Sequence, residues 1–535
     1  MNKKMKKISS ILLSGLLLFA MSCKESEFIE AYPDPAKLAA TTIEKQFTGM
    51  LQSNKDYVLP GYRFYFVTLR TTINHYVQTT GWVNGEGQYI PGSSGVEDVW
   101  FNYYNTLAQY RELQRVFAQR SAEEQKEKKI FMLAATVYMY DYTQKLVDLH
   151  GSIPFTEAGL LSANNGDYAK SIAKFDSPQD LYTKMLDDLK SIAAELNTIT
   201  LSAGYQKAFT VQDFVNYGDL NAWKRYTNSL RLRMLNRVSD VESLKARSNS
   251  EIAEILGSPT TYPIVETNAQ NIQMNVYDLN SPINSTGLQG ALESGASWYI
   301  NFAGKKMIDH MKTNADPRLP IIFQPGINAK GEYFGIDPTA NATVQAALAT
   351  DGMAALYNRV TFSGNHFFPG VLINAAEVNL IKAEYYLRTN NDAKAQTAYE
   401  TAIDQSVNFY NKILSLSKNI LGETNITIPA TANQITAYLA KDGVNWTKAG
   451  SSANKLALIA EQKWLHYNIT QPFENWSDVR RLDLPKFSFV PDNSNNQTLP
   501  PYRWTIPSNE ITYNPNYSAV KAQDNLTTKI FWDVK

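Results

Sequence analysis

The sequence predicts a mostly α-helical protein, a scaffold of helix pairs separated by long irregular loops. Five long segments carry apolar residues at spacings of three and four, the period of an amphipathic helix. One segment contains a turn so short that the helices on either side of it must be antiparallel neighbours. The stretches between the segments lack periodicity and are rich in Gly, Pro, Asn and Ser, which favours loops. With 44% hydrophobic and 19% charged residues among 535, the composition is typical of a globular protein.

Residues 1–22 have the form of a lipoprotein signal peptide. Four lysines precede an apolar run over residues 11–21, and the sole cysteine of the chain, Cys23, follows almost at once. A helix of this length reaches about 16 Å, whereas the hydrocarbon core of a bilayer is roughly 30 Å thick. The run is therefore too short for an ordinary spanning anchor. Small residues, Ala20 and Ser22, flank the expected cleavage site, and Cys23 directly after it resembles the lipobox of bacterial lipoproteins.

We expect cleavage before Cys23 and acylation of that residue. Several fatty chains would then hold the protein on a membrane surface, because each buried methylene contributes roughly 0.8 kcal/mol. Residues 23–35 would be a lipidated tether whose prolines favour extended backbone, and residues 36–535 a single domain. The alternative is cleavage at the same site that leaves Cys23 as an unmodified thiol.

The five helical segments are residues 96–120, 122–149, 177–196, 220–239 and 375–409. In the third of them, Leu181, Met185 and Leu189 form one apolar stripe, and Ser177 followed by proline supplies a start signal. The last segment divides at residues 389–392 into a helix hairpin. Its second arm places alanines at 395, 398 and 402 on one face, so that the partner helix can approach closely. This pattern resembles a tetratricopeptide repeat, although no clean 34-residue period runs along the chain.

The arginines of residues 220–239 and several tryptophans are predicted to be structural. Arg231, Arg233 and Arg237 share their helix with apolar residues, so we expect them to pair internally with carboxylates and carbonyls. Binding of an acidic ligand is the alternative. Four tryptophans lie on predicted helices or motif segments and are expected in the core: Trp100, Trp223, Trp464 and Trp476.

Composition and motifs exclude several classes of function. The formal charge is zero, so the positive field that nucleic-acid binding needs is missing. One cysteine and five scattered histidines give no metal-ligand spacing, and the adjacent Asp187 and Asp188 suit a solvated helix face. The sequence contains no nucleophile elbow, phosphate-cradling loop or dinucleotide fingerprint. We therefore expect no catalytic residues, no metal and no cofactor.

Four groups of motifs together resemble the SusD/RagB family of nutrient-binding outer-membrane lipoproteins. They are residues 149–158 (LHGSIPFTEA); residues 223–237 (WKRYTNSLRLRMLNR); residues 315–319 (ADPRL) with 374–384 (NAAEVNLIKAE); and residues 461–464 (EQKW), 476–481 (WSDVRR) and 501–510 (PYRWTIPSNE). The resemblance implies a scaffold of tetratricopeptide-like helix pairs without catalytic machinery. It also implies a lipid anchor at the outer-membrane surface, an extracellular nutrient as ligand, often a glycan, and a SusC-like TonB-dependent transporter as partner.

Aromatic residues on the long loops are the candidate ligand-binding groups. The unpatterned stretches are residues 79–95, 257–304, 328–341 and 492–517, and loops this long are usually functional or disordered. Sugar rings stack on indole and phenol, while their hydroxyls need amide or carboxyl partners. The first two stretches supply both kinds of group, namely Trp82, Tyr89 and Asn84, and Trp298, Tyr299 and Asn301. The alternative for either tryptophan is burial against the scaffold.

Three functions therefore compete. The leading hypothesis is a surface-anchored protein that captures oligosaccharides and delivers them to the transporter without turnover. The second keeps this architecture and takes a peptide as cargo, which the same loop residues would suit. The third is a lipid-anchored glycoside hydrolase, which needs two carboxyl groups roughly 5–10 Å apart across a cleft.

Overall fold

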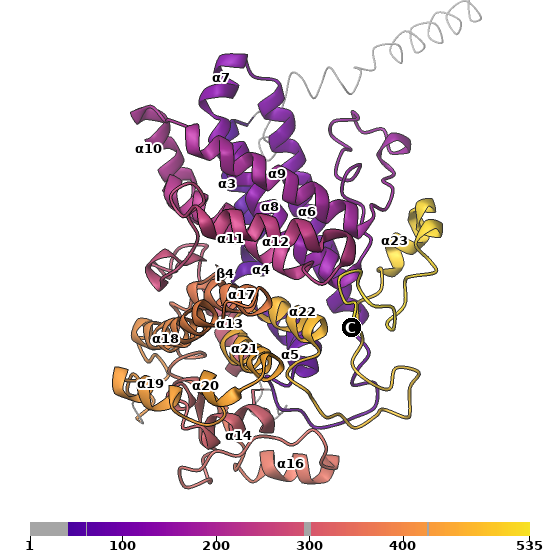
Figure 1. Ribbon diagram of the computed structural model, residues 1–535. Helices are drawn as coiled ribbons and strands as arrows, with labels where there is room; N and C mark the ends of the chain where they lie inside the picture. Colours follow the sequence, from indigo (N-terminus) through magenta and orange to yellow (C-terminus); the bar gives the residue numbers. More distant parts are fainter. Residues whose placement is uncertain (1–40, 60, 294–300, 425–426) are drawn as a thin grey trace, which may run out of the picture.

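The computed structural model describes residues 41–59, 61–293, 301–424 and 427–535. Figure 1 shows two groups of helices, one formed mostly by the first half of the chain and one mostly by the second, with α11 and α17 where they meet. Helix α5 lies with the second group beside α22, and α23 lies beside the first group. The first half of the chain contains α3 (Ile43–Ser53), α4 (Lys55–Val58), the π-helical turn η1 (Phe64–Leu69), α5 (Ile73–Tyr76), α6 (Ser93–Ala118), α7 (Ala122–Glu127), α8 (Lys129–His150), η2 (Ala169–Ser171), α9 (Pro178–Thr198), α10 (Ala203–Gln212), α11 (Leu220–Arg237) and α12 (Glu242–Gly257).

The second half of the chain contains the predicted hairpin. Its elements are η3 (Asn268–Gln270), α13 (Thr286–Glu293), α14 (Lys305–Thr313), α15 (Leu319–Ile322), α16 (Ala342–Thr350), α17 (Ala375–Arg388), α18 (Asp392–Leu416), α19 (Ala432–Leu439), α20 (Trp446–Ala449), α21 (Ser452–Tyr467), α22 (Pro472–Leu482), α23 (Ser508–Tyr513) and η4 (Pro515–Ala519). Ala395, Ala398 and Ala402 are buried between α17 and α18, and Tyr399 donates a hydrogen bond to Val444 O at 2.8 Å. The hairpin and its small-residue face are confirmed.

Two small antiparallel sheets connect distant parts of the chain. Strand β1 (Ile272–Met274) pairs with β4 (Gly370–Ile373), and β2 (Phe323–Gln324) pairs with β3 (Leu356–Tyr357). Ile272 lies opposite Ile373, and Phe323 lies opposite Tyr357. The second sheet ends at the candidate site and positions an aromatic layer behind its wall.

The arginine-bearing helix α11 is held by buried ion pairs. Arg233 donates to both carboxylate oxygens of Glu377 and, at 3.0 Å, to Asp141. Arg237 binds Glu474 and Asp478. All of these side chains are buried, because α11 crosses from the first helical group to α17 and α22. Internal pairing is therefore confirmed, and so is the burial of the four tryptophans expected in the core.

Two expectations about the secondary structure need correction. The segment predicted as one helix over 122–149 is two helices, because the chain turns at Lys128, whose ammonium group lies between Glu44 and Glu124 at 2.7 and 2.8 Å. The stretches 257–304 and 492–517 are not wholly irregular, since they contain β1, α13 and α23. Segments of three to eight residues are too short for their periodicity to be seen in sequence.

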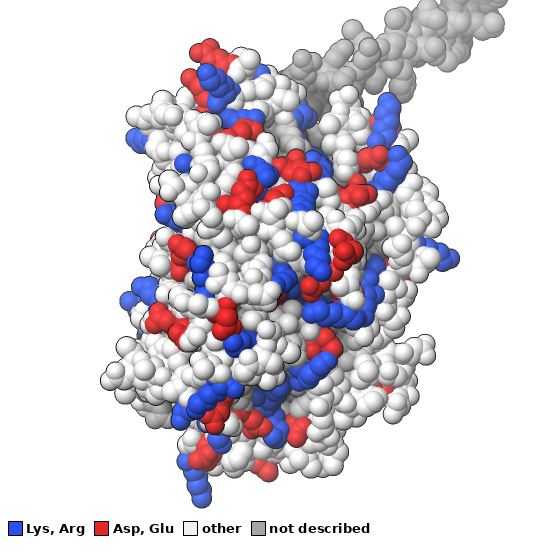
Figure 2. All heavy atoms as spheres, viewed as in Figure 1, with Lys and Arg blue, Asp and Glu red and all other residues white. Residues whose placement is uncertain are grey.

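The surface carries charges of both signs. Figure 2 shows Lys and Arg interspersed with Asp and Glu over the face in view, as expected for a chain of zero formal charge. Among the described residues, none of the helices combines the length and apolar character needed to cross a bilayer. Cys23 and the rest of residues 1–40 lie outside the described part of the chain.

Candidate functional site

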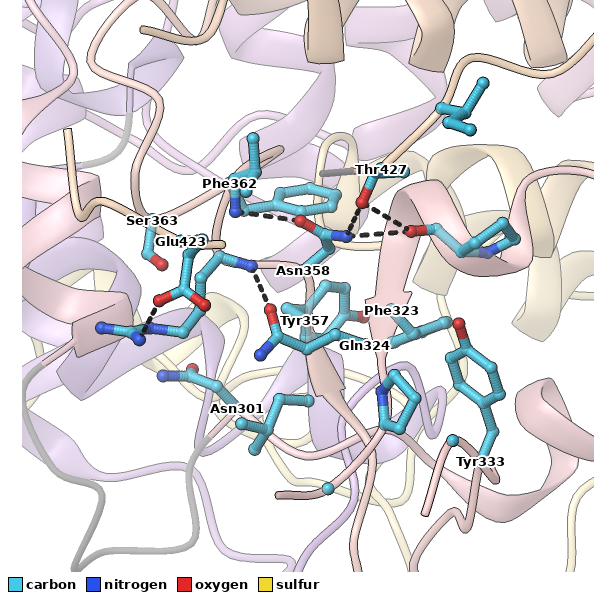
Figure 3. A pocket seen from close by; sticks show the side chains of 18 of the residues that line it. Asn301, Phe323, Gln324, Tyr333, Tyr357, Asn358, Phe362, Ser363, Glu423 and Thr427 are labelled. Atoms are coloured by element: carbon cyan, nitrogen blue, oxygen red, sulfur yellow. Dashed lines mark hydrogen bonds and ion pairs between the residues drawn. The ribbon is translucent and has the colours of Figure 1, made fainter. Parts of the chain in front are cut away.

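A cavity of about 1260 Å³ lies in the second half of the molecule, between α13, the β2–β3 sheet and the chain that leads into α19. Figure 3 shows side chains of the β2–β3 region around it, together with Glu423 and Thr427 of the chain before α19. Tyr333 lines the cavity with a half-buried ring, and three buried aromatic residues that are at most 3% exposed form the layer behind its wall. The rings of Phe323 and Tyr357 are 4.8 Å apart, and Phe362 packs edge-on against Tyr357 at 5.3 Å. The rim is apolar as well, with Ile327 92% and Ile428 77% exposed.

Amide groups are placed along the same cavity. Gln324 Oε1 accepts a hydrogen bond from Arg359 N at 2.8 Å, and Asn358 Nδ2 donates to Thr427 Oγ1 at 2.7 Å (Figure 3). Both residues line the cavity next to aromatic rings. A cavity with apolar walls and a few placed amides has the composition of a small-molecule site.

Two carboxylates of the cavity share one guanidinium. Arg359 Nη2 lies 2.8 Å from Glu293 Oε2, and Arg359 Nη1 binds Glu423. Burial acts to raise the pKa of Glu293, but hydrogen bonds from Arg359 and Ser363 outweigh it and hold that pKa below the usual range. A general acid needs a raised pKa, so the environment of Glu293 opposes that role.

The loop that carries Trp82 is hydrogen-bonded to the edge of this cavity. Gly81 N donates to Phe302 O at 2.7 Å, and Thr80 forms a β-bridge with Ala303. Phe302 itself lines the cavity. Two sequence stretches that were predicted to bind ligand, although more than 200 residues apart, are thus brought together. Trp82 is half-buried, with its ring near Arg70 and His75.

The other residues of the first stretch face the protein. Asn84 donates from its backbone to Gln345 Oε1 at 2.7 Å and from Nδ2 to Pro338 O at 2.8 Å. Tyr89 was expected to present its ring to ligand, and this is wrong. It is 1% exposed, donates to Val490 O at 2.8 Å, and stacks on His75. The loop folds against residues 487–492, which encloses the phenol and raises its pKa to about 12.

The second stretch is described only at its ends. Asn301 lines the cavity, donates from Nδ2 to Leu292 O, and accepts a hydrogen bond on its backbone oxygen from Tyr357 N at 2.9 Å. Its Oδ1 has no partner within the described residues. Glu293, at the other end, lines the same cavity. Trp298 and Tyr299 lie outside the described residues.

Sequence reasoning missed most of the cavity. Phe323, Gln324 and Tyr357 come from strands of two residues, and Asn358 and Thr427 follow no motif. The only signal for Phe323 and Gln324 is their position near the unpatterned stretch 328–341. Gln324 and Asn358 come together at the cavity only because strands β2 and β3 pair.

We expect Gly81→Ala to destabilise the junction between the Trp82 loop and the cavity. A Cβ at Gly81 would lie 2.7 Å from Ala303 O and 2.8 Å from Ile336 Cβ, so the backbone must shift. Overpacking of this kind costs typically about 1–3 kcal/mol. Thermal unfolding of this variant should show a lowered midpoint. Gly85→Ala is the matched control, since its Cβ would meet nothing within 4 Å. Equal midpoints for the two variants would contradict the tight junction.

The profile of the SusD-like family described as "Starch-binding associating with outer membrane" matches residues 36–507. The chain belongs to this family. The match includes both loops and the whole cavity described above.

Solved SusD-like structures share the fold. A chitin-binding SusD homologue from Flavobacterium johnsoniae superposes with a TM-score of 0.68 at 20% identity, over 91% of this chain and 99% of that one. A SusD homologue from Bacteroides fragilis gives 0.69 at 21% identity over 93% and 100%. A SusD/RagB family protein from Bacteroides thetaiotaomicron gives 0.71 at 18% identity over 92% and 99%. The predicted helical SusD-like fold is confirmed. A search of curated protein sequences found no match to this chain.

Proposed function

We propose that this SusD-like protein binds oligosaccharides at the cell surface and delivers them to a SusC-like TonB-dependent transporter without turnover. The observation that carries the proposal is the cavity lined by amides and the half-buried ring of Tyr333, hydrogen-bonded at its edge to the loop of the half-buried Trp82. Sugar rings bind to aromatic faces, and their hydroxyls bind to amides. The family description as starch-binding and the chitin-binding homologue support a glycan as the ligand.

Trp82 and Asn301 are the described residues that we assign to the ligand, with Trp298 and Tyr299 as the part of the site that rests on sequence alone. Asn84 supports the loop and contributes through its position next to Trp82. The anchor is an acylated Cys23 followed by the tether 23–35, which would keep the domain at the outer-membrane surface. The association with the outer membrane in the family description supports this placement.

The carboxylates of the cavity favour binding over hydrolysis. Glu293 and Glu423 are both bound to Arg359. In a glycosidase one carboxyl must hold a proton at working pH, and Arg359 favours the ionised form of Glu293 by lowering its pKa. Among the described residues, no group of three or more His, Cys, Asp or Glu side chains is arranged to hold a metal ion.

We expect Trp82→Ala to weaken binding of the cognate glycan by about tenfold or more, because a lost stacking face removes both buried area and ring contact. Isothermal titration calorimetry with a panel of oligosaccharides measures this, with Trp298→Ala tested in parallel. Tyr513→Ala is the control, since this tyrosine is 79% exposed on α23.

The outcomes separate the site from the function. If glycans bind with unchanged affinity to both tryptophan variants, the binding site lies elsewhere, but the proposed glycan binding is still supported. Binding of peptides and of none of the glycans would replace the proposal with peptide capture. Release of reducing sugar by the purified protein would establish a hydrolase.

A further inference from the structure

The guanidinium of Arg70 is enclosed by aromatic rings beside Trp82. Its central carbon lies 4.2 Å from the ring centre of Phe66 and 5.3 Å from that of Trp82. Phe66 in turn stacks on Tyr62 at 5.2 Å with 11° between the ring planes. Arg70 ends the π-helical turn η1, where its N–H donates to Tyr65 O at 3.0 Å. This backbone places Tyr62, Phe66 and Arg70 in one row that leads to the ligand-binding tryptophan.

Arg70 differs from Arg233 and Arg318 of the core because it has no counter-ion among the described residues. Arg233 binds Asp141 at 3.0 Å, and Arg318 binds Asp316 at 2.6 Å. Arg70 is only 7% exposed, yet within the described residues no carboxylate oxygen lies within 4.0 Å of it. Its Nε donates to Phe66 O at 3.0 Å, and its two terminal nitrogens donate no hydrogen bond in the described part of the chain.

The charge of Arg70 is nevertheless retained. Burial lowers its pKa to about 10, so the group is protonated at neutral pH. His75, which also contacts Trp82, is buried and its pKa is lowered to about 4, so it is neutral there. Aromatic faces attract a cation but supply no opposite charge. A largely buried guanidinium without an anion is a charge whose desolvation is not compensated. Its planar N–H groups can donate two parallel hydrogen bonds to a carboxylate or a sulfate.

We propose that Arg70 binds an oxyanion carried by the ligand, so that the cognate glycan is acidic: a uronate or a sulfated oligosaccharide. This inference rests on the proposed function. A sugar that contacts the exposed part of Trp82 brings its substituents to the edge where Arg70 lies. The terminal nitrogens of Arg70 form no hydrogen bond within the described residues, but they are not fully shielded from solvent. In this they differ from Nε and Nη1 of Arg231, which are both unbonded and shielded. The terminal nitrogens of Arg70 remain available to a ligand.

Matched pairs of ligands test the charge directly. Oligogalacturonate is compared with its methyl ester, and sulfated carrageenan oligosaccharides with the same chains after desulfation, by calorimetry against the full mature protein. We expect at least one acidic member to bind tenfold or more tighter than its neutral counterpart, with an affinity that falls as salt rises. The two pairs distinguish a carboxylate from a sulfate ester.

Arg70→Gln should remove the preference for the acidic ligand, and Arg70→Lys should keep part of it. Arg63→Gln is the control, because Arg63 is exposed and already paired with Asp98. Arg70→Gln should also leave the thermal midpoint unchanged or raised, since it removes an unpaired buried charge. A purely structural Arg70 would instead give a lowered midpoint and unchanged ligand preference.

Failure of this inference is distinguishable from failure of the proposed function. Wild-type protein that binds neutral starch or chitin oligosaccharides and treats both members of each pair alike would overturn the acidic ligand and leave glycan capture intact. Protein that binds none of the neutral or acidic glycans would overturn both.

Discussion

Arg233→Gln is expected to lower the free energy of unfolding by about 3–5 kcal/mol. Arg233 lies between Glu377 and Asp141 and also donates to Leu372 O, and it is 3% exposed. Removal of one member of a buried ion pair leaves the other charges desolvated and unpaired. Glu377 is the most affected, because burial already raises its pKa and Arg233 is the largest influence that lowers it.

Equilibrium denaturation in urea or guanidinium measures this loss. Arg63→Gln is the matched control, since its ion pair with Asp98 lies at the surface and should contribute at most about 1 kcal/mol. If both replacements cost the same, the buried pairs of α11 do not stabilise the fold as described.

Acidification from pH 7 to 4.5 is expected to destabilise the protein through three buried histidines. Loss of hydration lowers the pKa of His75 to about 4 and those of His150 and His466 to about 3. In the unfolded chain the pKa is about 6.5. Between these values the unfolded state binds a proton that the folded state does not. The contribution of each neutral histidine to the free energy of unfolding is therefore fully present above about pH 6.5. Below that pH it falls by about 1.4 kcal/mol per pH unit until the folded-state pKa is reached.

His466→Gln isolates one of these contributions. His466 Nε2 lies 2.8 Å from Asn374 Oδ1, and Nδ1 lies 2.9 Å from Ser406 Oγ, which suits a neutral imidazole. The variant should be less stable than wild type at pH 7, but the difference between their free energies of unfolding should narrow as the pH falls to 4.5. Buried carboxyls whose pKa is raised, such as Asp148, act in the opposite direction and cancel in this difference.

His366→Gln serves as the comparison. His366 is half-buried, and desolvation lowers its pKa. Because His366 is less enclosed than His466, the difference in free energy of unfolding between His366→Gln and wild type should change less with pH. A His466→Gln difference that stays constant from pH 7 to 4.5 would mean that His466 titrates normally in the folded protein.

Local pattern predicted the helices well. The ranges 96–120, 177–196 and 220–239 agree with α6, α9 and α11 to within about three residues, and the hairpin at 389–392 is confirmed. Long amphipathic segments carry their period within the segment itself, and capping residues such as Ser177 mark their ends. The short elements β1, β2, β3 and α13 contain too few residues to show a period.

The candidate site was predicted only in part. Trp82 and Asn301 were named from their loops, and the structure joins those loops through Gly81 and Phe302. Tyr89 was named by the same reasoning and is buried, because the contact that covers it comes from residues 487–492, some 400 positions away. Exposure depends on such distant contacts, so residue type and loop position cannot determine it.

The amino-acid sequence by itself determined the helical scaffold, the family and the internal pairing of the arginines of α11, because these depend on local period, motif order and residue chemistry. Only the tertiary structure decided which aromatic rings remain accessible, where the cavity lies and that Arg70 has no counter-ion in the described part of the chain. Each of these depends on whether a particular partner from a distant segment is present, and the chain specifies that only once it has folded.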